Sequence, residues 1–459
     1  MPSFNIPGPS IASRAFSLAG LDSAISFDIL TRLWSFVSGP VTSALIVIYF
    51  TPEQQGYYYT FLSIAGLVQL IDLGGITPVI VQFMAHESAR LSIDKDRSLK
   101  GGPPALSRLV SVGRFYFFWS GLWAPAVLGG LGAGGYIFLS RSGTGDVEWE
   151  VAWLALCALV TLDICTRPAL TLLEGCNMVG LANIVRFGRA VASSLALWAV
   201  MVLDGGLWAT PVAAAAGIVS LGAVGWFWLR RFYASFLTQP AGPLVSWKGE
   251  LWPVQWRFAL AGIGSVVTYG LLVPVVYHFH GPEEAGRMGF TWVLVQAVIT
   301  TSSAWLNTRV PQFGILAAAR DRASLDKLAL RTGTYTFVIG IAGSVSLLSA
   351  LTIVQAVAPS VASRMLGLVP TALLLTGGIA ANVIGVMSIY MRAHKQEPML
   401  IVSLLGAAAM LSCFIVMGKY FGSLGVASGY LSVMTIIVLP GAIWTFNKFR
   451  VRNYRSPAL

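Results

Sequence analysis

Six charged side chains lie inside long apolar stretches of this sequence, where they are well placed to bind an ion. They are the arginines Arg32, Arg167 and Arg309 and the acids Asp28, Asp72 and Asp163, and Arg257 begins a further apolar stretch. An ionised side chain in the middle of a lipid bilayer costs roughly 2.5–3.5 kcal/mol on insertion scales. Each of these residues therefore needs a partner, a water-filled cavity or a ligand of opposite charge.

Two acid–arginine pairs have the spacing of one helical turn. Asp28 and Arg32 are four residues apart, as are Asp163 and Arg167, so each pair can neutralise itself along one helix face. Each arginine also lies toward a predicted cytoplasmic helix end, where its long side chain can reach the membrane interface. A structural role and a functional role are equally compatible with this spacing.

Arg309 and Arg257 have no acid within four positions. The planar donor fork of an arginine suits a phosphate or diphosphate group, so Arg309 is the leading candidate for substrate binding and Arg257 is the next. Arg32 and Arg167 complete the candidate anion site. The alternative for Arg309 is a side chain that only reaches the membrane interface.

Asp72, in contrast to these arginines, is an acid with no base three or four positions away. It is a candidate for coupling transport to proton or sodium movement, or the structural partner of an arginine on another helix. Asp163 and Asp28 are the other candidates for ion coupling. No other cofactor and no metal site are expected, because the four cysteines have no paired spacing.

The elements that carry these residues are predicted to be transmembrane helices. Of the 459 residues, 56% are hydrophobic and 11% are charged, whereas a soluble protein has about 25% charged residues. Apolar runs of about 20 residues are long enough to cross the hydrocarbon core as helices. Twelve such runs are predicted, at 28–50, 57–84, 114–139, 151–173, 180–203, 207–229, 257–279, 288–315, 332–356, 367–390, 398–418 and 424–446. The expected fold is an all-α polytopic membrane protein, and the runs lack the alternation of a β-barrel.

The basic residues indicate the orientation of the chain. The net charge is +11, but most lysines and arginines fall in alternate loops and in the tails. The residues predicted on the opposite side are Arg141, Arg287, Arg364 and Lys419. This bias places both termini in the cytoplasm and explains the charge without nucleic acid.

A weak internal repeat divides the sequence. With a shift of 230 residues, the matches include Pro52 with Pro282, Gly56 with Gly286 and Gln82 with Gln312. Repeats of six crossings have the same orientation, so we expect two parallel six-helix lobes, between which transporters bind their substrates. The expected boundaries are a cytoplasmic N-terminal segment at 1–25 with the composition of an interfacial helix, a first lobe at 26–229, a cytoplasmic linker at 230–256, a second lobe at 257–447 and a basic cytoplasmic tail at 448–459.

Five segments resemble those of a known family. They are TPEQQGYYYTF (51–61), QFMAHESA (82–89), LLEGCN (172–177), GPEEAGRMGFTW (281–292) and RAHKQEP (392–398). They resemble bacterial O-antigen and polysaccharide flippases of the multidrug/oligosaccharidyl-lipid/polysaccharide exporter superfamily. The resemblance implies two lobes around a central cavity that opens alternately to either side of the bacterial inner membrane. It also implies export of an undecaprenyl-diphosphate-linked oligosaccharide, with a polysaccharide polymerase and glycosyltransferases as functional partners.

Three other functions compete with that of a flippase. A multidrug exporter of the same architecture extrudes cations and would need unpaired acids, whereas arginines outnumber unpaired acids here. A membrane-embedded glycan-processing enzyme needs reactive groups in a sizeable outer loop, and only His278 and His280 beside Glu283 and Glu284 form such a group. A major-facilitator transporter also has two parallel halves, but the loop at 87–113 lacks its glycine- and arginine-rich pattern. We therefore expect transport and no catalysis.

Overall fold

The computed structural model describes residues 23–93, 99–141, 147–237, 242–394 and 398–455. Within these ranges, residues 23–26, 69–73, 93, 261, 265 and 453–455 are described by their backbone alone. Most of the segment predicted at 1–25 and the end of the basic tail lie outside the described residues.

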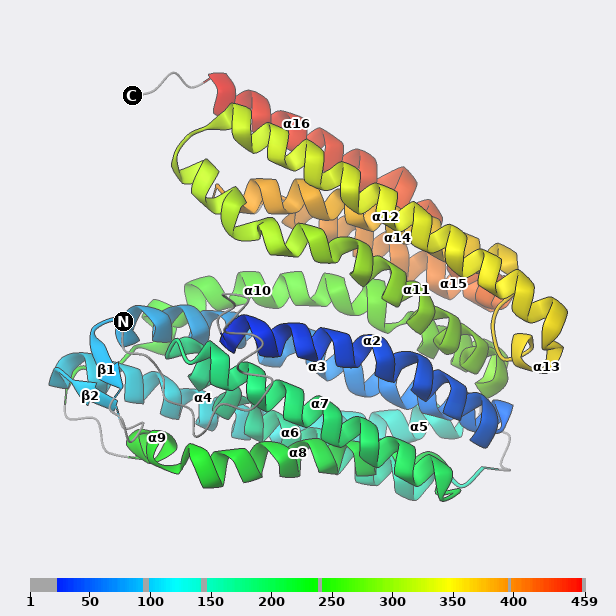
Figure 1. The fold of residues 1–459 in the computed structure, drawn as a ribbon, viewed down its shortest axis with the longest axis horizontal. Helices are drawn as coiled ribbons and strands as arrows, with labels where there is room; N and C mark the ends of the chain where they lie inside the picture. The colour runs from blue at the N-terminus through cyan, green and yellow to red at the C-terminus, as the bar shows by residue number, and fades with distance from the viewer. Residues whose placement is uncertain (1–22, 94–98, 142–146, 238–241, 395–397, 456–459) are drawn as a thin grey trace. The chain divides into compact units, whose positions relative to one another are not determined.

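The described chain is almost entirely α-helical (Figure 1). Its α-helices are α2 (Ser23–Tyr49), α3 (Pro52–Ser88), α4 (Pro103–Gly129), α5 (Gly135–Ser140), α6 (Glu150–Gly175), α7 (Val179–Val202), α8 (Ala209–Trp228), α9 (Arg230–Ala234), α10 (Trp252–Ser265), α11 (Leu272–Ala318), α12 (Arg322–Val357), α13 (Pro359–Ala362), α14 (Leu368–Arg392), α15 (Leu400–Ser432) and α16 (Leu439–Arg455). In the described residues the strands are β1 (Leu91–Ile93) and β2 (Leu99–Gly101), a short antiparallel hairpin. The sequence did not predict this hairpin.

Among the described residues, nine helical stretches are long and apolar enough to cross a membrane. Two of them contain two crossings each, because the backbone leaves the helical conformation at Gly281 (φ 80°) in α11 and at Gly422 (φ 57°) in α15. Glycine takes such positive φ values without the steric cost of a Cβ. The 37-residue helix α3 is a further crossing. These helices coincide with the twelve predicted runs, so the all-α polytopic fold is confirmed.

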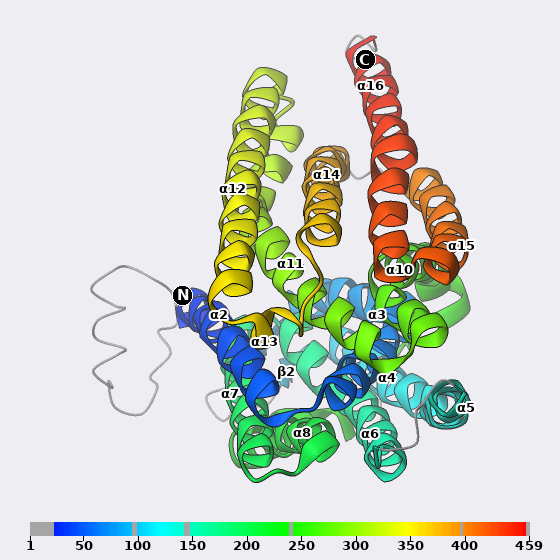
Figure 2. The same ribbon diagram turned by 90° about the vertical axis from the view of Figure 1, so that its right-hand side faces the viewer.

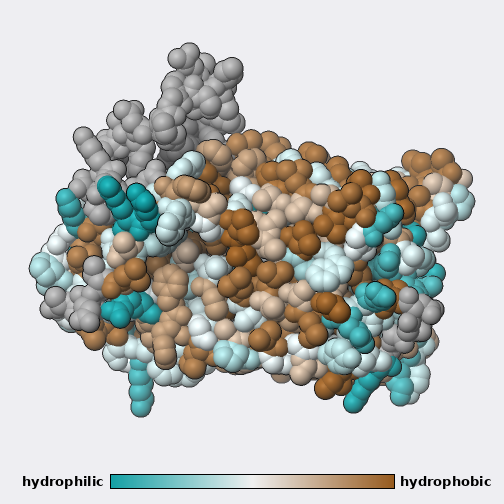
Figure 3. Space-filling model, turned by 90° about the horizontal axis from the view of Figure 1, so that it is seen from below, coloured by the Kyte–Doolittle hydropathy of each residue, from teal (hydrophilic) through white to brown (hydrophobic). Residues whose placement is uncertain are grey.

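Apolar side chains cover much of the outside of the helices. Figure 3 shows a largely hydrophobic face whose hydrophilic side chains gather toward its two ends. On α8, Val219, Trp226 and Phe227 are 69%, 68% and 76% exposed. A surface of this kind would drive aggregation in water, whereas in a bilayer it contacts lipid.

The chain packs as two compact units, which we describe separately. Unit 1 consists of Met1–Phe50, Leu73–Tyr136 and Glu148–Phe258, and unit 2 consists of Thr51–Asp72, Ile137–Val147 and Ala259–Leu459. The first half of α3 packs in unit 2, although it lies in the part of the sequence expected to form the first lobe. Helix α3 passes from one unit to the other next to Gly74 and Gly75, whose φ values of 76° and 71° interrupt its helical backbone. The lobe boundaries themselves remain a prediction.

In unit 1, hydrogen bonds and an ion pair connect the last part of the linker to α4. The backbone N–H groups of Gly242 and Val245 donate to the hydroxyl groups of Ser107 (2.9 Å) and Ser111 (3.1 Å). Arg108 of α4 also pairs with Glu250 of the linker at 2.6 Å. These bonds satisfy linker groups that would otherwise need water, and they hold the chain against α4 as it approaches α10.

In unit 2, α14 packs between α12 and α16 (Figure 2). Helix α11 packs against α12, α14 and α15. A buried cluster joins these helices near one end of the unit. It is formed by Leu306, Phe313, Leu325, Tyr390, Met391 and Phe449.

The internal repeat reappears in unit 2 as a reciprocal contact between α3 and α11. A Cβ on Gly56 would lie 1.9 Å from the carbonyl oxygen of Pro282. A Cβ on Gly286 would lie 2.9 Å from the backbone nitrogen of Gly56 and 3.3 Å from the carbonyl oxygen of Pro52. The sequence shift of 230 pairs these same residues, so each half presents its equivalent surface to the other, as around a two-fold axis. Both positions have to be glycine because backbone atoms fill the space of a side chain.

Candidate functional site

The predicted site residues with described side chains lie in both units, and those of unit 1 other than Arg257 gather around Asp163 of α6. Its side chain is only 9% exposed. Arg189 of α7 donates to one oxygen of this carboxylate. The Nε atom of Arg167, one turn further along α6, lies 3.8 Å from the other oxygen. The predicted proximity of Asp163 and Arg167 is therefore present, but the closer partner of Asp163 is Arg189, which the spacing of residues did not indicate.

Arg167 retains an unused hydrogen-bond donor. Its side chain is 14% exposed, and its buried Nη2 atom has no hydrogen-bond partner among the described residues. A buried donor without an acceptor costs about 1–3 kcal/mol. An acceptor oxygen of a ligand or of a water molecule would remove this cost.

The charges continue along α7 and onto α2. Arg186 pairs with Glu174 and donates to the side-chain oxygen of Asn183 at 3.0 Å. Asp28 and Arg32 form the predicted pair at 2.9 Å, with side chains 48% and 63% exposed, and Asp28 also acts electrostatically on Arg186. We call this group the α2–α6–α7 cluster, and it comprises Asp28, Arg32, Asp163, Arg167, Glu174, Arg186 and Arg189. Its four arginines face three acids, so most of its positive charge is neutralised within the cluster.

Arg309 of unit 2 has a different environment. Its guanidinium group lies 5.0 Å from the ring centre of Trp305 and donates to the side-chain oxygen of Gln312 at 3.1 Å. On α12, Arg331 lies 5.5 Å from the ring centre of Tyr335 and donates to its hydroxyl group at 3.4 Å. The rings of Trp305 and Tyr335 meet edge to face, 5.6 Å apart. We call these four residues the arginine–aromatic ladder, and neither of its arginines forms an ion pair with a described acid.

A groove of about 380 Å³ opens beside the ladder, between the end of α11 and the start of α12. We call it the α11–α12 groove, and it is lined by Gln312, Ile315, Leu316, Ser324, Lys327, Leu328 and Arg331. It thus combines the positive charges of Lys327 and Arg331 with an apolar wall. Gln312 connects the groove to Arg309 through its hydrogen bond.

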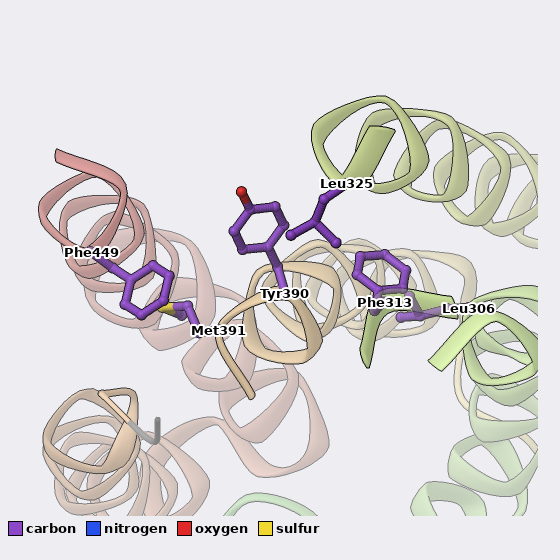
Figure 4. Packing of buried hydrophobic residues seen from close by; sticks show 6 residues of the cluster. All are labelled: Leu306, Phe313, Leu325, Tyr390, Met391 and Phe449. Atoms are coloured by element: carbon purple, nitrogen blue, oxygen red, sulfur yellow. The ribbon is translucent and has the colours of Figure 1, made fainter. Parts of the chain in front are cut away.

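The walls of the groove pack against the buried cluster of unit 2. Leu316 and Leu328 line the groove and pack on this cluster. Figure 4 shows Leu325, Phe313 and Tyr390 gathered between the helices, with Phe449 next to Met391. Since interiors of this kind are close-packed, the two helices keep a fixed spacing at the groove.

Two predicted site residues stand apart from these groups. Arg257 is exposed and lies over the ring of Trp256 at 5.6 Å, and no described contact joins it to the other candidates. The side chain of Asp72 lies outside the described side chains, so its predicted role is neither supported nor weakened. His280, considered for an enzyme site, has its Nε2 atom 2.8 Å from the carbonyl oxygen of Gly418. No group of three or more His, Cys, Asp or Glu residues in the described part of the chain could hold a metal ion.

Comparison with known proteins gives a clear result for the fold. No protein-family model and no curated protein sequence matches this chain. Among solved structures, it is similar to an inward-facing multidrug resistance MATE family transporter of the MOP superfamily, with a TM-score of 0.68, 14% identity, and 95% of this chain and 100% of that chain covered. It is also similar to the lipid II flippase MurJ in an inward closed conformation, with a TM-score of 0.65, 14% identity, and 94% of this chain and 91% of that chain covered.

A third similar structure is a MOP superfamily transporter from Pyrococcus furiosus, described as having a binding pocket of reverse polarity. Its TM-score is 0.54 at 13% identity, with 94% of this chain and 93% of that chain covered. At such identities the likeness establishes the architecture but not the substrate. The chain therefore has the fold of the MOP superfamily transporters, a fold found in both a multidrug resistance transporter and a lipid II flippase.

Proposed function

We propose that the protein is a flippase that moves an undecaprenyl-diphosphate-linked oligosaccharide, such as an O-antigen unit, from the cytoplasmic to the outer leaflet of the bacterial inner membrane. The polyprenyl tail stays in the lipid, while the diphosphate and the glycan cross through a polar path by alternating access. Passage of a bare diphosphate through hydrocarbon is prohibitive, so the path needs fixed positive charges. Both termini lie in the cytoplasm in this proposal, as the basic loops indicate.

The observation that carries this proposal is the environment of Arg309. It lies within a membrane-crossing helix, forms no ion pair with a described acid, and rests on an aromatic ring and an amide. Its donors are therefore available to a phosphate group, which an arginine binds through two parallel hydrogen bonds. The similarity to a lipid II flippase adds support for a lipid-linked substrate.

The other predicted residues have supporting roles in this proposal. Arg167 offers an unused donor, and the exposed side chains of Arg32 and Arg257 add further positive charge for the headgroup. Proton or sodium movement at Asp163, Asp72 or Asp28 would drive the cycle. A polysaccharide polymerase and glycosyltransferases would act after and before the transport step.

Transport in proteoliposomes with a fluorescent lipid-linked oligosaccharide tests the proposal. We expect Arg309→Ala to reduce the rate at least tenfold, roughly the loss of one charge-assisted hydrogen bond, and Arg309→Glu to abolish transport. Lys448→Ala is the matched control, because Lys448 also lies over an aromatic ring, that of Trp444 at 4.9 Å. Normal transport by both Arg309 variants at normal protein levels would show that Arg309 does not bind the substrate.

The alternative is a multidrug exporter, and the similarity to a multidrug resistance transporter supports it. Such a protein would make cells less susceptible to cationic drugs. A flippase instead restores surface polysaccharide to a strain that lacks its own flippase and leaves drug susceptibility unchanged. A membrane-embedded glycan-processing enzyme would alter the glycan during transport, which mass spectrometry of the transported lipid detects.

A further inference from the structure

The α11–α12 groove holds positive charge with which no described acid of unit 2 forms an ion pair. Lys327 and Arg331 are one turn apart on α12, so both project from the same face, and both line the groove. Neither forms an ion pair with a described acid. We propose that this groove is a loading site for a lipid that carries a diphosphate headgroup. This inference rests on the proposed function and adds a binding step before Arg309.

The nearest acid on α12 is engaged elsewhere. Asp326 accepts a hydrogen bond from the hydroxyl group of Tyr390 at 2.7 Å and pairs with Arg450 of α16 at 2.6 Å. A second acid, Asp321, caps the start of α12 by accepting from the backbone N–H of Ser324 at 3.1 Å. The carboxylate of Asp321 is thus engaged by the start of α12, whereas Lys327 and Arg331 line the groove.

The depth of the cations suggests a direction of travel. Helix α11 ends at Ala318 and α12 begins at Arg322. At 1.5 Å per residue, Arg309 and Arg331 both lie roughly 14 Å from the turn between these helices, and Lys327 lies roughly 8 Å from it. In the proposed orientation this turn is cytoplasmic. A headgroup from the inner leaflet would therefore meet Lys327 first, and then Arg331 and Arg309 at the same level.

The apolar wall suits the chain of such a lipid. Ile315 is 67% exposed, and Leu316 and Leu328 complete the wall beside it. An isoprenoid or acyl chain can lie against these side chains while its headgroup contacts the cations.

The charge of the groove favours a diphosphate over an ordinary phospholipid. A diphosphate that links a lipid to a sugar carries a negative charge on each phosphate group, whereas a phosphodiester headgroup carries one in total. Lys327, Arg331 and the neighbouring Arg309 together exceed a single negative charge. A diphosphate neutralises more of this charge, and each charge-assisted contact that it gains adds to its affinity.

Binding to the full-length protein in phosphatidylcholine nanodiscs provides the test, with a fluorescent polyprenyl diphosphate as the probe. We expect the double variant Lys327→Gln/Arg331→Gln to bind this probe roughly 10- to 100-fold more weakly, the loss expected for one or two charge-assisted contacts. Lys448→Gln should bind like the wild type. Lys327→Arg/Arg331→Lys keeps both charges and should retain most of the affinity. That result would show that the double glutamine variant binds weakly because it lacks the charges and not because changes at these positions prevent folding.

Competition experiments identify the source of the anion. Phosphatidylglycerol in the nanodisc should compete weakly, and inorganic pyrophosphate should compete only at much higher concentration because it lacks the chain. Equal competition by phosphatidylglycerol would overturn the assignment to a diphosphate lipid. Unchanged binding by the double glutamine variant would overturn the site.

Transport and binding measurements on the wild type and the double variant distinguish failure of this inference from failure of the proposed function. If the wild type transports the lipid-linked oligosaccharide and the double variant transports it with an unchanged half-saturating concentration, the loading site is wrong and the flippase stands. If the wild type binds the probe through Lys327 and Arg331 but transports no lipid-linked oligosaccharide, the groove stands and the flippase is wrong.

Discussion

The α2–α6–α7 cluster and the arginine–aromatic ladder are two solutions for placing arginines in a membrane. In the cluster, Asp163 lies between Arg167 and Arg189, and the charges offset one another. In the ladder, Arg309 and Arg331 lie over aromatic rings and have no acid partner among the described residues. A ring lowers the cost of the charge by about 0.5–2 kcal/mol without occupying the donors of the guanidinium group. An arginine paired with an acid must exchange a partner to bind an anion, whereas an arginine on a ring need not.

This difference leads us to propose different functions for the two regions. The ladder and its groove are suited to the capture of an anion. The cluster is suited to stability, because Asp163 holds both Arg167 of its own helix and Arg189 of α7. Three changes test the contrast, and they are ordered by the size of the effect that we expect.

Asp163→Ala should have the largest effect. It leaves Arg167 and Arg189 without their shared carboxylate, and removal of one partner of a buried ion pair costs roughly 3–5 kcal/mol. Because Arg189 is 31% exposed, we expect the lower end of this range, measured as a lower thermal unfolding temperature in detergent. Adding Arg189→Ala to Asp163→Ala should recover part of the loss. Wild-type stability of the single variant would show that the cluster is not held by charge.

Gln312→Glu should give Arg309 of the ladder an acid partner, as the arginines of the α2–α6–α7 cluster have. The new carboxylate would stand where the amide oxygen now accepts from Arg309 at 3.1 Å and would compete with an incoming anion. We expect roughly tenfold weaker binding of a polyprenyl diphosphate, equivalent to about 1.4 kcal/mol, with little change in stability. Gln312→Met, which adds no charge, is the control. Tighter binding by the glutamate variant would contradict the anion-binding role of Arg309.

Asp28→Asn should have the smallest effect. The pair that Asp28 forms with Arg32 is exposed on both sides, and such pairs contribute roughly 0–1 kcal/mol. We expect the unfolding temperature to shift by far less than in Asp163→Ala. A large loss of transport without a loss of stability would instead assign Asp28 to ion coupling.

The sequence was sufficient for the fold and for the local part of the site. Long apolar runs can only be helices in a bilayer, and the four-residue spacing of Asp163 and Arg167 places them on one helix face. It was insufficient for contacts between helices, such as that of Asp163 with Arg189, because no periodicity reports which helix faces meet. Part of the ladder could have been detected, since Trp305 precedes Arg309 by four residues and Arg331 precedes Tyr335 by four. The proximity of the rings of Trp305 and Tyr335 could not have been predicted from the sequence.

The reciprocal contact of Gly56 and Gly286 has the geometry of a homodimer interface within one polypeptide. In a true homodimer both copies of a surface must change together. Here the copies are encoded separately and can diverge, as they do at the next matched pair, where Tyr59 fills the space that Gly289 leaves open. The fusion of the two halves thus retains the fit of a symmetric pair and lets each half carry its own charged group, the α2–α6–α7 cluster in the first half and the arginine–aromatic ladder in the second.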